Sequence, residues 1–222
     1  MRVHPMLLAL DKYLWFQKTK ELTNAGIILD LGGGEGMFET LFQGRDQRFA
    51  ILEISPPKNT LRGNVEYIVY GGEEFPFSNQ SFDLGIALHA IEHVPRHIRP
   101  RVIAELVRVV RHRIILAFPM RRLHFEQLFR AIFTLYAAIG LSKMKRFYEE
   151  HLRYGLPTPH FISSLVGSPP TSSEFYFGKL SCLVLLIQLT FPVLVPLSGF
   201  FARTIRKLDD REPVFALLWW RF

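Results

Sequence analysis

The stretch at residues 27–36, IILDLGGGEG, decides the fold class of this 222-residue chain. Its apolar residues up to Asp30 predict a buried parallel strand, and the four glycines that follow predict a tight turn that opens a helix. Glycine lets the backbone come close to a ligand, and a helix N-terminus offers free N–H groups. Because open α/β sheets bind nucleotides at such a strand end, we expect a ligand of that kind here.

The spacing of the glycines narrows the class of ligand. A dinucleotide fingerprint counted from Gly32 and Gly34 needs a third glycine at the position of Met37. The sequence contains no phosphate-binding G-x-x-x-x-G-K-[ST] motif either. The pattern is instead D-x-G-x-G-x-G over residues 30–36, and the next apolar run ends in Glu53. A carboxylate at the tip of the second strand can accept both hydroxyls of a ribose.

Further motifs follow in order along the chain. Residues 65–70 predict a third strand, and the block EEFPF follows at residues 73–77. Residues 81–89, SFDLGIALH, predict a fourth strand that leads into AIEHVP at residues 90–95. This order of motifs resembles the class I S-adenosylmethionine-dependent methyltransferases, in particular the small-molecule group with an E-E-x-P-F…S-F-D…E-H-V-P signature.

The resemblance covers residues 25–120 and continues more weakly at residues 150–157, EHLRYGLP. It implies an α/β fold with a Rossmann-like, seven-stranded, mostly parallel sheet in the order 3-2-1-4-5-7-6, and helical insertions that form an apolar lid. The expected parts of the chain are an N-terminal helix (1–24), a cofactor-binding core (25–120), a helical lid and acceptor region with the sixth strand (121–212), and the last strand (213–222).

The resemblance also assigns residues to the implied cofactor, S-adenosyl-L-methionine. We expect the methionine end to contact Asp30, Gly32, Gly33, Gly34 and Gly36, and the ribose to contact Glu53. We expect the adenine to contact Ile54, Gly71, Gly72 and Glu73. Leu88 and His89 are expected on the side of the methionine and the acceptor. One position departs from the family pattern. An acidic residue usually follows the third strand and binds the adenine amino group, and this chain has Gly71 there. Backbone groups of residues 71–73 or the Glu73 carboxylate would replace it, and one lost hydrogen bond of this kind costs about 1 kcal/mol.

Two histidines are candidates for a general base, which the reaction needs only for some acceptors. They are His89, at the expected end of the fourth strand, and His124, just past the expected fifth strand. Residues 89–93, HAIEH, also match an H-x-x-E-H zinc motif, which requires a helix that presents both histidines. Because His89 ends a strand and Pro95 follows, we expect no metal site. We interpret His93 as a residue that structures the turn.

Charge is distributed unevenly along the chain. Residues 30–92 contain ten acidic and four basic residues, which suits the cationic sulfonium that the resemblance implies. Residues 93–153 contain thirteen Lys or Arg and four Glu, with six arginines around the helix expected before a fifth strand at residues 113–119. These arginines are either a solvated helix face or a basic field for an anionic partner, such as a phosphorylated sugar or a lipid headgroup. The chain shows no recognisable nucleic-acid-binding module, so we do not expect a nucleic acid partner.

The number of cysteines and the N-terminal residues indicate the cellular compartment in which we expect the protein. The single cysteine, Cys182, excludes internal disulfides and favours a reducing compartment. Residues 1–18 do not resemble a signal peptide, because Asp11 and Lys12 interrupt the short apolar stretch. We therefore expect a cytoplasmic protein, with peripheral attachment to the inner face of a membrane as the alternative.

Two apolar stretches distinguish the second half of the chain. Residues 180–202 carry no formal charge over 23 positions, which is long enough to span a bilayer. A single span would, however, separate the last strand, residues 213–222, from its sheet. We therefore expect residues 180–202 and residues 128–141 to form lid or core helices near the acceptor, or to dock on a membrane surface.

The predicted function is methyl transfer from S-adenosyl-L-methionine to a small-molecule or lipid- or glycan-linked acceptor, at oxygen or nitrogen. Two alternatives stay open. One is a catalytically silent binding module with this fold at a membrane surface, for which Gly71 and the lack of a clear base argue. The other is an NAD(P)-dependent oxidoreductase, against which Met37 and the EEFPF block argue.

Overall fold

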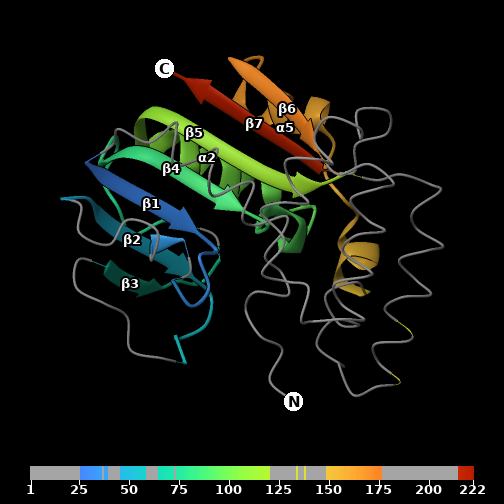
Figure 1. Cartoon of the computed structure of the whole chain (residues 1–222), viewed down its shortest axis with the longest axis horizontal. Helices are drawn as coiled ribbons and strands as arrows, with labels where there is room; N and C mark the ends of the chain where they lie inside the picture. The colour runs from blue at the N-terminus through green and yellow to red at the C-terminus, as the bar shows by residue number, and fades with distance from the viewer. Residues whose placement is uncertain are drawn as a thin grey trace, which may run out of the picture.

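The computed structural model contains one mixed sheet with helices packed on one of its faces (Figure 1). It describes residues 26–36, 38–39, 46–58, 65–72, 74–120, 134, 138, 149–176 and 215–222. The strands are β1 (Ile27–Leu31), β2 (Arg48–Glu53), β3 (Val65–Val69), β4 (Phe82–Leu88), β5 (Val110–Pro119), β6 (Ser172–Tyr176) and β7 (Phe215–Arg221). The helical elements include η3 (Ile91–His93), α2 (Arg99–Val109) and α5 (Pro159–Val166), and residues 149–154 are helical as well.

The strand order is β3-β2-β1-β4-β5-β7-β6, which confirms the predicted topology. Strands β1 to β5 pair in parallel, and β7 is antiparallel to both β5 and β6. The last strand along the chain therefore lies inside the sheet and not at its edge. Its apolar sequence, FALLWWR, suits this place, because Ala216, Leu217 and Leu218 are fully buried.

Strand β5 begins earlier than the sequence indicates. The prediction was residues 113–119, whereas the strand begins at Val110, which pairs with Phe82 at the start of β4. Arg111 and His112 are exposed, so the apolar pattern that identifies a buried strand begins only after them. The register between β4 and β5 also shifts between Phe82 and Leu84, which accommodates this first part of the strand.

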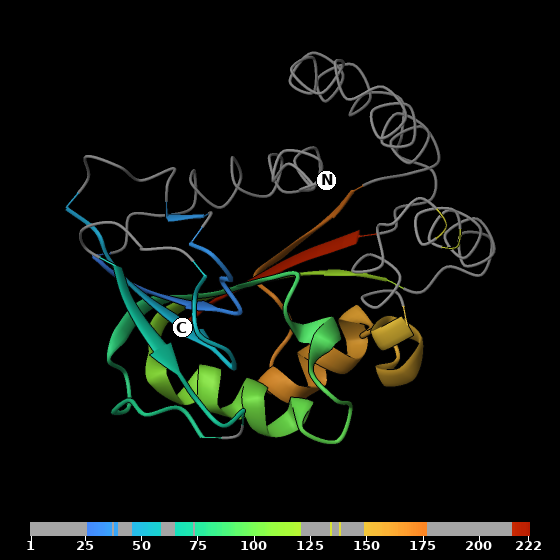
Figure 2. The same cartoon turned by 90° about the horizontal axis from the view of Figure 1, so that it is seen from below.

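Helices α2 and α5 cover the same face of the sheet (Figure 2). Four apolar residues of α2 recur at helical spacing and are fully buried against the strands: Val102, Ile103, Leu106 and Val109. Gly85 of β4 lies beneath this helix. A Cβ at Gly85 would lie 2.6 Å from Cγ2 of Val110 and 2.9 Å from Cδ1 of Leu106, so only glycine allows the helix to approach this closely.

Both faces of the sheet carry a hydrophobic core. Successive residues of a strand point to opposite faces. Leu29 accordingly belongs to the cluster shared with α2, and its neighbour Ile28 belongs to a second cluster that contains Phe38 and Phe49. The rings of Phe38 and Phe49 meet edge to face, with centroids 6.4 Å apart. Burial on both faces is typical of central parallel strands, and it explains why the first two strands read as continuous apolar runs.

Several predictions fall outside the described residues. They concern the N-terminal helix at 1–24, Met37, Glu73, His124, Cys182, residues 180–202 and most of residues 128–141. Within the last segment, Thr134 and Ala138 are described, and both are helical and exposed. No helix in the described part of the chain combines the length and the apolar content that a membrane crossing requires.

Candidate functional site

The carboxyl ends of β1 and β2 lie side by side at the glycine turn. Parallel pairing places Leu31 beside Leu52 near the tips of both strands. The amide of Gly32 donates to the carbonyl oxygen of Leu52 at 2.9 Å, and the amide of Gly34 donates to Oε1 of Glu53 at 3.0 Å. A hydrogen bond thus joins the glycine turn to Glu53, the two sequence features on which the site prediction depends.

Gly32 and Gly34 both have positive φ angles, +72° and +61°, but their surroundings differ. A Cβ at Gly32 would lie 2.5 Å from the Cβ of Ala90, so Gly32 allows the turn to pack against the segment after β4. A Cβ at Gly34 would meet no described atom within 4 Å. Gly34 therefore presents bare backbone on the side where the sequence predicts a ligand.

Two buried carboxyl groups lie close to the glycine turn, on the side of the protein interior. Asp30 at the end of β1 is 2% exposed, and Glu39 is 6% exposed. Oδ2 of Asp30 would lie 2.6 Å from a Cβ at Gly33, so this carboxyl group packs directly against the turn. Burial raises the pKa of Glu39, and its interaction with Asp30 lowers that pKa in part. Asp30 therefore supports the backbone of the turn, and its expected direct contact with the methionine end stays a prediction.

An apolar surface borders the tip of β2. Ile54 follows Glu53 directly, and its side chain is 69% exposed. Gly72, with a positive φ of +94°, lies next to it, because a Cβ there would be 3.9 Å from Cγ2 of Ile54. A Cβ at Gly71 would meet no described atom within 4 Å. An exposed aliphatic side chain beside bare glycine backbone fits the flat face of a purine, as the sequence predicts for these positions.

Glu53 is held in place from several sides. Its Oε2 accepts from the amide of Ile54 at 3.1 Å, and its carbonyl oxygen accepts from the amide of Tyr70 at 2.9 Å. Burial, followed by the negative charge of Glu53, raises the pKa of Tyr70 to about 12. The same two causes raise the pKa of Tyr67 to about 12, and its hydroxyl donates to the carbonyl oxygen of Ser55 at 2.9 Å. These phenols therefore stay neutral beside the carboxylate at physiological pH.

The other expected contacts, Leu88 and His89, lie at the end of β4. His89 has a φ of +58°, a left-handed conformation that is uncommon for residues other than glycine. Its amide donates to the carbonyl oxygen of Ala117 at 2.8 Å, and Nδ1 of its ring lies 3.4 Å from Oε1 of Glu92. The backbone thus turns the imidazole toward Glu92. A role for His89 as general base stays a prediction, and it would have to use Nε2.

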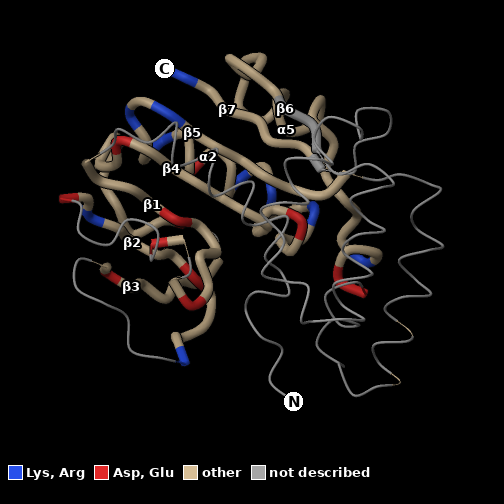
Figure 3. Tube along the Cα trace, viewed as in Figure 1, with Lys and Arg blue, Asp and Glu red and all other residues tan. Residues whose placement is uncertain are grey.

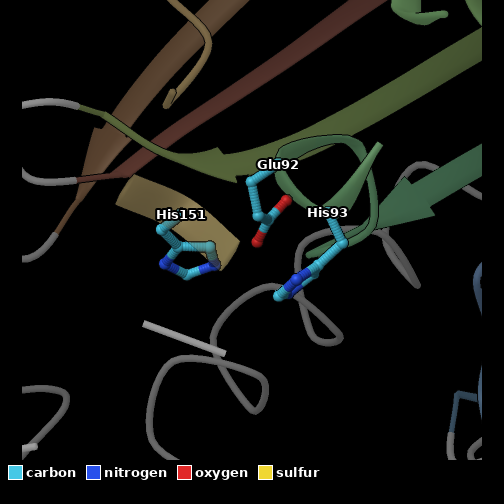
Figure 4. A group of neighbouring side chains, drawn as sticks. All are labelled: Glu92, His93 and His151. Carbon is cyan, nitrogen blue, oxygen red and sulfur yellow. The ribbon is translucent and has the colours of Figure 1, made fainter. Parts of the chain in front are cut away.

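Next to His89, three side chains from two distant segments converge (Figure 4). Glu92 and His93 belong to η3, and His151 belongs to the helical residues 149–154. The rings of His93 and His151 have their centroids 4.8 Å apart. Glu92 is 1% exposed, and Nδ1 of His93 lies 3.0 Å from Oε2 of Glu150. The side chain of His93 thus contacts the distant segment 149–154, and its expected role in structuring the turn stays a prediction.

Arg99 at the start of α2 connects the two segments of this cluster. Its guanidinium group, 1% exposed, donates to the carbonyl oxygens of Val94 at 2.9 Å and Glu92 at 3.1 Å. It also donates to the carbonyl oxygens of Gly155 at 2.7 Å and Tyr154 at 3.4 Å. One buried side chain therefore fixes η3 against the end of the helical residues 149–154.

The arginines around α2 are largely paired within the protein. Arg101 contacts Glu74 at 2.6 Å, Arg108 contacts Glu105 at 2.7 Å and Arg111 contacts Asp83 at 3.2 Å, while Arg99 is buried as described above. The sequence count therefore overstates the positive charge that this helix offers to an anionic partner. The charge segregation itself is visible in Figure 3, where acidic residues gather around β1, β2 and β3.

Three residues that shape the site were missed in the sequence: Glu39, Arg99 and His151. His151 lies in EHLRYGLP, which extends the family resemblance, but nothing in the sequence pairs it with Glu92 about sixty positions earlier. Arg99 was counted as one of several surface charges, since periodicity does not show which arginine of a basic helix is buried. Glu39 follows the turn by three positions and resembles an ordinary polar helix residue.

Comparison with known proteins agrees with the geometry. Residues 29–118 match the family model described as a methyltransferase domain. An uncharacterized methyltransferase of Mycobacterium sp. (strain JLS) is 29% identical over 102 residues, which cover 44% of this chain and 40% of the relative. The uncharacterized methyltransferase of Mycobacterium avium (strain 104) is 30% identical over 104 residues, again 44% of this chain and 40% of the relative. The chain thus spans about two fifths of the length of these relatives.

Solved structures share the fold at low sequence identity. The plantazolicin methyltransferase BpumL, in complex with a triazolic desmethylPZN analog and SAH, has a TM-score of 0.58 and 14% identity, covering 99% of this chain and 86% of its own. The [4+2]-cyclase SpnF has a TM-score of 0.58 and 12% identity, covering 96% of this chain and 80% of its own. Because a methyltransferase and a cyclase both have this fold, the chemistry must be argued from the site.

Proposed function

Because residues 29–118 match a methyltransferase domain and the sheet has the strand order expected for that fold, we propose that this chain transfers a methyl group from S-adenosyl-L-methionine to a small-molecule acceptor. The observation that carries the proposal is the hydrogen bond from the Gly34 amide to the Glu53 carboxylate, beside bare backbone and the exposed Ile54. Gly34, Glu53 and Ile54 would then lie next to the methionine tail, the ribose and the adenine, in that order.

Each group has a chemical task toward such a cofactor. Glu53 already accepts from two backbone amides, and a carboxylate has about four acceptor positions, so it can also accept from both ribose hydroxyls. Ile54 and Gly72 offer an apolar face to the adenine. The backbone around Gly34 approaches the methionine end, and the acidic surroundings suit a sulfonium cation.

The cofactor supplies an activated methyl group, so the protein contributes mainly by positioning the acceptor in line with it. Positioning of this kind lowers a barrier by about 7–11 kcal/mol. Leu88 and His89 at the end of β4 lie on the acceptor side of the proposed site. An acceptor that carries a neutral amine or an ionised hydroxyl needs no general base, which is consistent with the involvement of the His89 ring in the contact with Glu92.

Calorimetry with S-adenosylhomocysteine and S-adenosylmethionine tests the proposal. We expect Glu53→Ala to weaken the affinity for both about 10- to 100-fold, because it removes charge-assisted hydrogen bonds worth about 1.5–3 kcal/mol. Gly34→Asp should abolish binding, since it adds a side chain and a negative charge in the ligand's space. The matched control is Glu66→Ala, which removes an exposed carboxylate from β3. A parent chain that binds neither compound would overturn the proposal and favour a catalytically silent binding module.

The same titrations separate the oxidoreductase alternative. Here the third glycine of the dinucleotide fingerprint is replaced by Met37. NADH and NADPH should therefore show no saturable binding to the parent chain. If one of them competes with S-adenosylhomocysteine at micromolar concentration, the site is a dinucleotide site.

We further propose that the acceptor is apolar or lipid- or glycan-linked, and that the chain docks on the inner face of a membrane. The support is the apolar composition of residues 128–141 and 180–202 and the seven Lys or Arg residues against three Glu between 121 and 153, outside the paired arginines of α2. The purified chain should cosediment with anionic vesicles more than with neutral ones. Equal cosedimentation with both, at the level of a control protein without such stretches, would contradict membrane docking.

A further inference from the structure

The cluster of Glu92, His93 and His151 plays no part in the proposed cofactor contacts. Each of the three residues offers one ligand atom, and these atoms all lie within 4.8 Å of one another. We propose that they bind a divalent transition-metal ion, with Zn²⁺ as the probe. This site differs from the H-x-x-E-H motif of residues 89–93, because its second histidine comes from a separate helical segment and not from His89.

The ligand set fits such an ion. Two imidazoles and one carboxylate are a common ligand set of catalytic zinc sites, in which a fourth position stays open for water or a substrate oxygen. Bonds of about 2.0–2.2 Å in tetrahedral geometry place ligand atoms about 3.4 Å apart. The ligand atoms of the cluster, which lie within 4.8 Å of one another, would have to approach by at most about 1.4 Å to reach that separation. The mixture of nitrogen and oxygen ligands favours zinc or cobalt over magnesium, which prefers oxygen.

Polar atoms of the cluster are buried and lack protein partners. Among the described residues, Oε2 of Glu92 and Nε2 of His151 are buried and have no hydrogen-bond partner. A buried polar atom without a partner costs about 1–3 kcal/mol, so such atoms call for an explanation. In Figure 4 the Glu92 carboxylate lies between the two rings, and a bound cation there would satisfy both atoms at once.

The surroundings have the features of a preformed metal site. Metal-bound histidines usually hydrogen bond through their second ring nitrogen to a carboxylate, which fixes the ring orientation. Glu150 provides such a carboxylate, since its Oε2 lies 3.0 Å from Nδ1 of His93. Arg99 fixes the two segments that carry the ligands through its bonds to the carbonyl oxygens of Glu92 and Gly155.

The protonation states also suit a cation. Burial lowers the pKa of His151 to about 4, so this ring is neutral and able to bind a metal at pH 7. Burial on its own raises the pKa of Glu92, but the neighbouring histidines, His89 above all, outweigh that effect and lower it. The carboxylate is therefore ionised, as a metal ligand must be.

Titration of the metal-free full chain with Zn²⁺ tests the site without any cofactor. We expect one Zn²⁺ per chain to bind, and His151→Gln and Glu92→Gln to weaken this binding at least about tenfold, because even the loss of a residue that only orients a ligand costs that much. His160→Gln, at an exposed position of α5, is the matched control and should leave the affinity unchanged. Equal affinities for the parent and all three variants would show adventitious binding to surface histidines and overturn the proposal.

A second measurement uses the parent chain alone, so a variant that misfolds leaves the test intact. Diethyl pyrocarbonate modifies accessible histidines, and mass spectrometry locates the modified residues. Zn²⁺ should protect His93 and His151 from modification but not His160. If all three are modified equally with and without Zn²⁺, there is no metal site here. Metal binding does not depend on methyl transfer, so this result stands apart from the affinity for S-adenosylhomocysteine.

Discussion

At the scale of single residues, the sequence indicates local geometry best where a position has few alternative roles. A carboxylate at the tip of the second strand has few roles other than accepting hydrogen bonds there, and Glu53 does so from Gly34 and Ile54. Glycines at a strand end likewise indicate positive φ angles, which Gly32 and Gly34 have. The sequence did not reveal the buried polar residues, because burial depends on neighbours that come from other elements.

Glu105 shows how one partly buried ion pair makes stability depend on pH. Its carboxylate accepts from Nε and Nη2 of Arg108 at 2.8 and 2.7 Å and from the amide of Phe75 at 2.9 Å. The Arg108 hydrogen bonds, above all, lower its pKa from 4.5 to about 2. The unfolded state therefore binds more protons in this range, and stability falls as the pH drops from about 5 toward 2.

The predicted result is that Glu105→Gln lowers the free energy of unfolding at neutral pH by about 1.5–3 kcal/mol, the range for hydrogen bonds to charged groups. The difference from the parent should shrink between about pH 5 and pH 2, as the parent carboxylate becomes protonated. Urea unfolding of both proteins at several pH values measures this difference in the free energy of unfolding. A constant difference over that range would mean that the ion pair does not act as described.

At the scale of elements, two of the motifs that suggested the family hold the sheet together. In EEFPF, Glu74 pairs with Arg101 and the backbone of Phe75 bonds to Glu105, so this block attaches the segment after β3 to α2. In SFD, Asp83 accepts from the amides of Gly26 and Ile27 and holds the beginning of β1. These motifs identify the fold well because they hold its elements together.

Arg99 is the residue with which an element-scale prediction can be made. Arg99→Met should destabilise the chain by about 2–4 kcal/mol, because four buried or half-buried carbonyl oxygens lose their donor. It should also weaken Zn²⁺ binding without removing a ligand, since η3 is no longer fixed to residues 154–155. Thermal unfolding and zinc titration measure the two effects.

The control for this prediction is Arg101→Met, two positions along the same helix. Arg101 and Glu74 are 51% and 77% exposed, and exposed pairs of this kind contribute about 0–1 kcal/mol. If both variants unfold at the same temperature as the parent, Arg99 does not connect the two segments energetically.

At the scale of the whole molecule, β7 completes the sheet, because it lies between β5 and β6. β7 pairs with β5 from Arg113–Arg221 to Pro119–Phe215 and with β6 on its other side. Trp220 is 1% exposed, and its indole Nε1 donates to the carbonyl oxygen of Ser168 at 3.0 Å, which ties the segment before β6 to this strand. Residues 168–176 thus depend on β7 for their place in the fold.

A chain truncated after residue 212 should therefore lose cooperative unfolding, because β5 and β6 lose their shared neighbour and Trp220 leaves the core. Removal of Phe222 alone, which is 52% exposed, should change the melting temperature little. Circular dichroism during heating measures both. A truncated chain that still melts in one sharp transition would show that the sheet is complete without β7.

Local patterns along the chain were enough to predict the first four strands and the last one, and to place the glycine turn beside Glu53. The order of the strands came from the family resemblance, with which the match of residues 29–118 to the methyltransferase domain agrees. The buried carboxyl pair of Asp30 and Glu39, the internal pairing of the arginines of α2, and the meeting of Glu92 and His93 with His151 required the folded chain. They arise from packing between distant segments, and a linear pattern does not record which polar side chain the packing will bury.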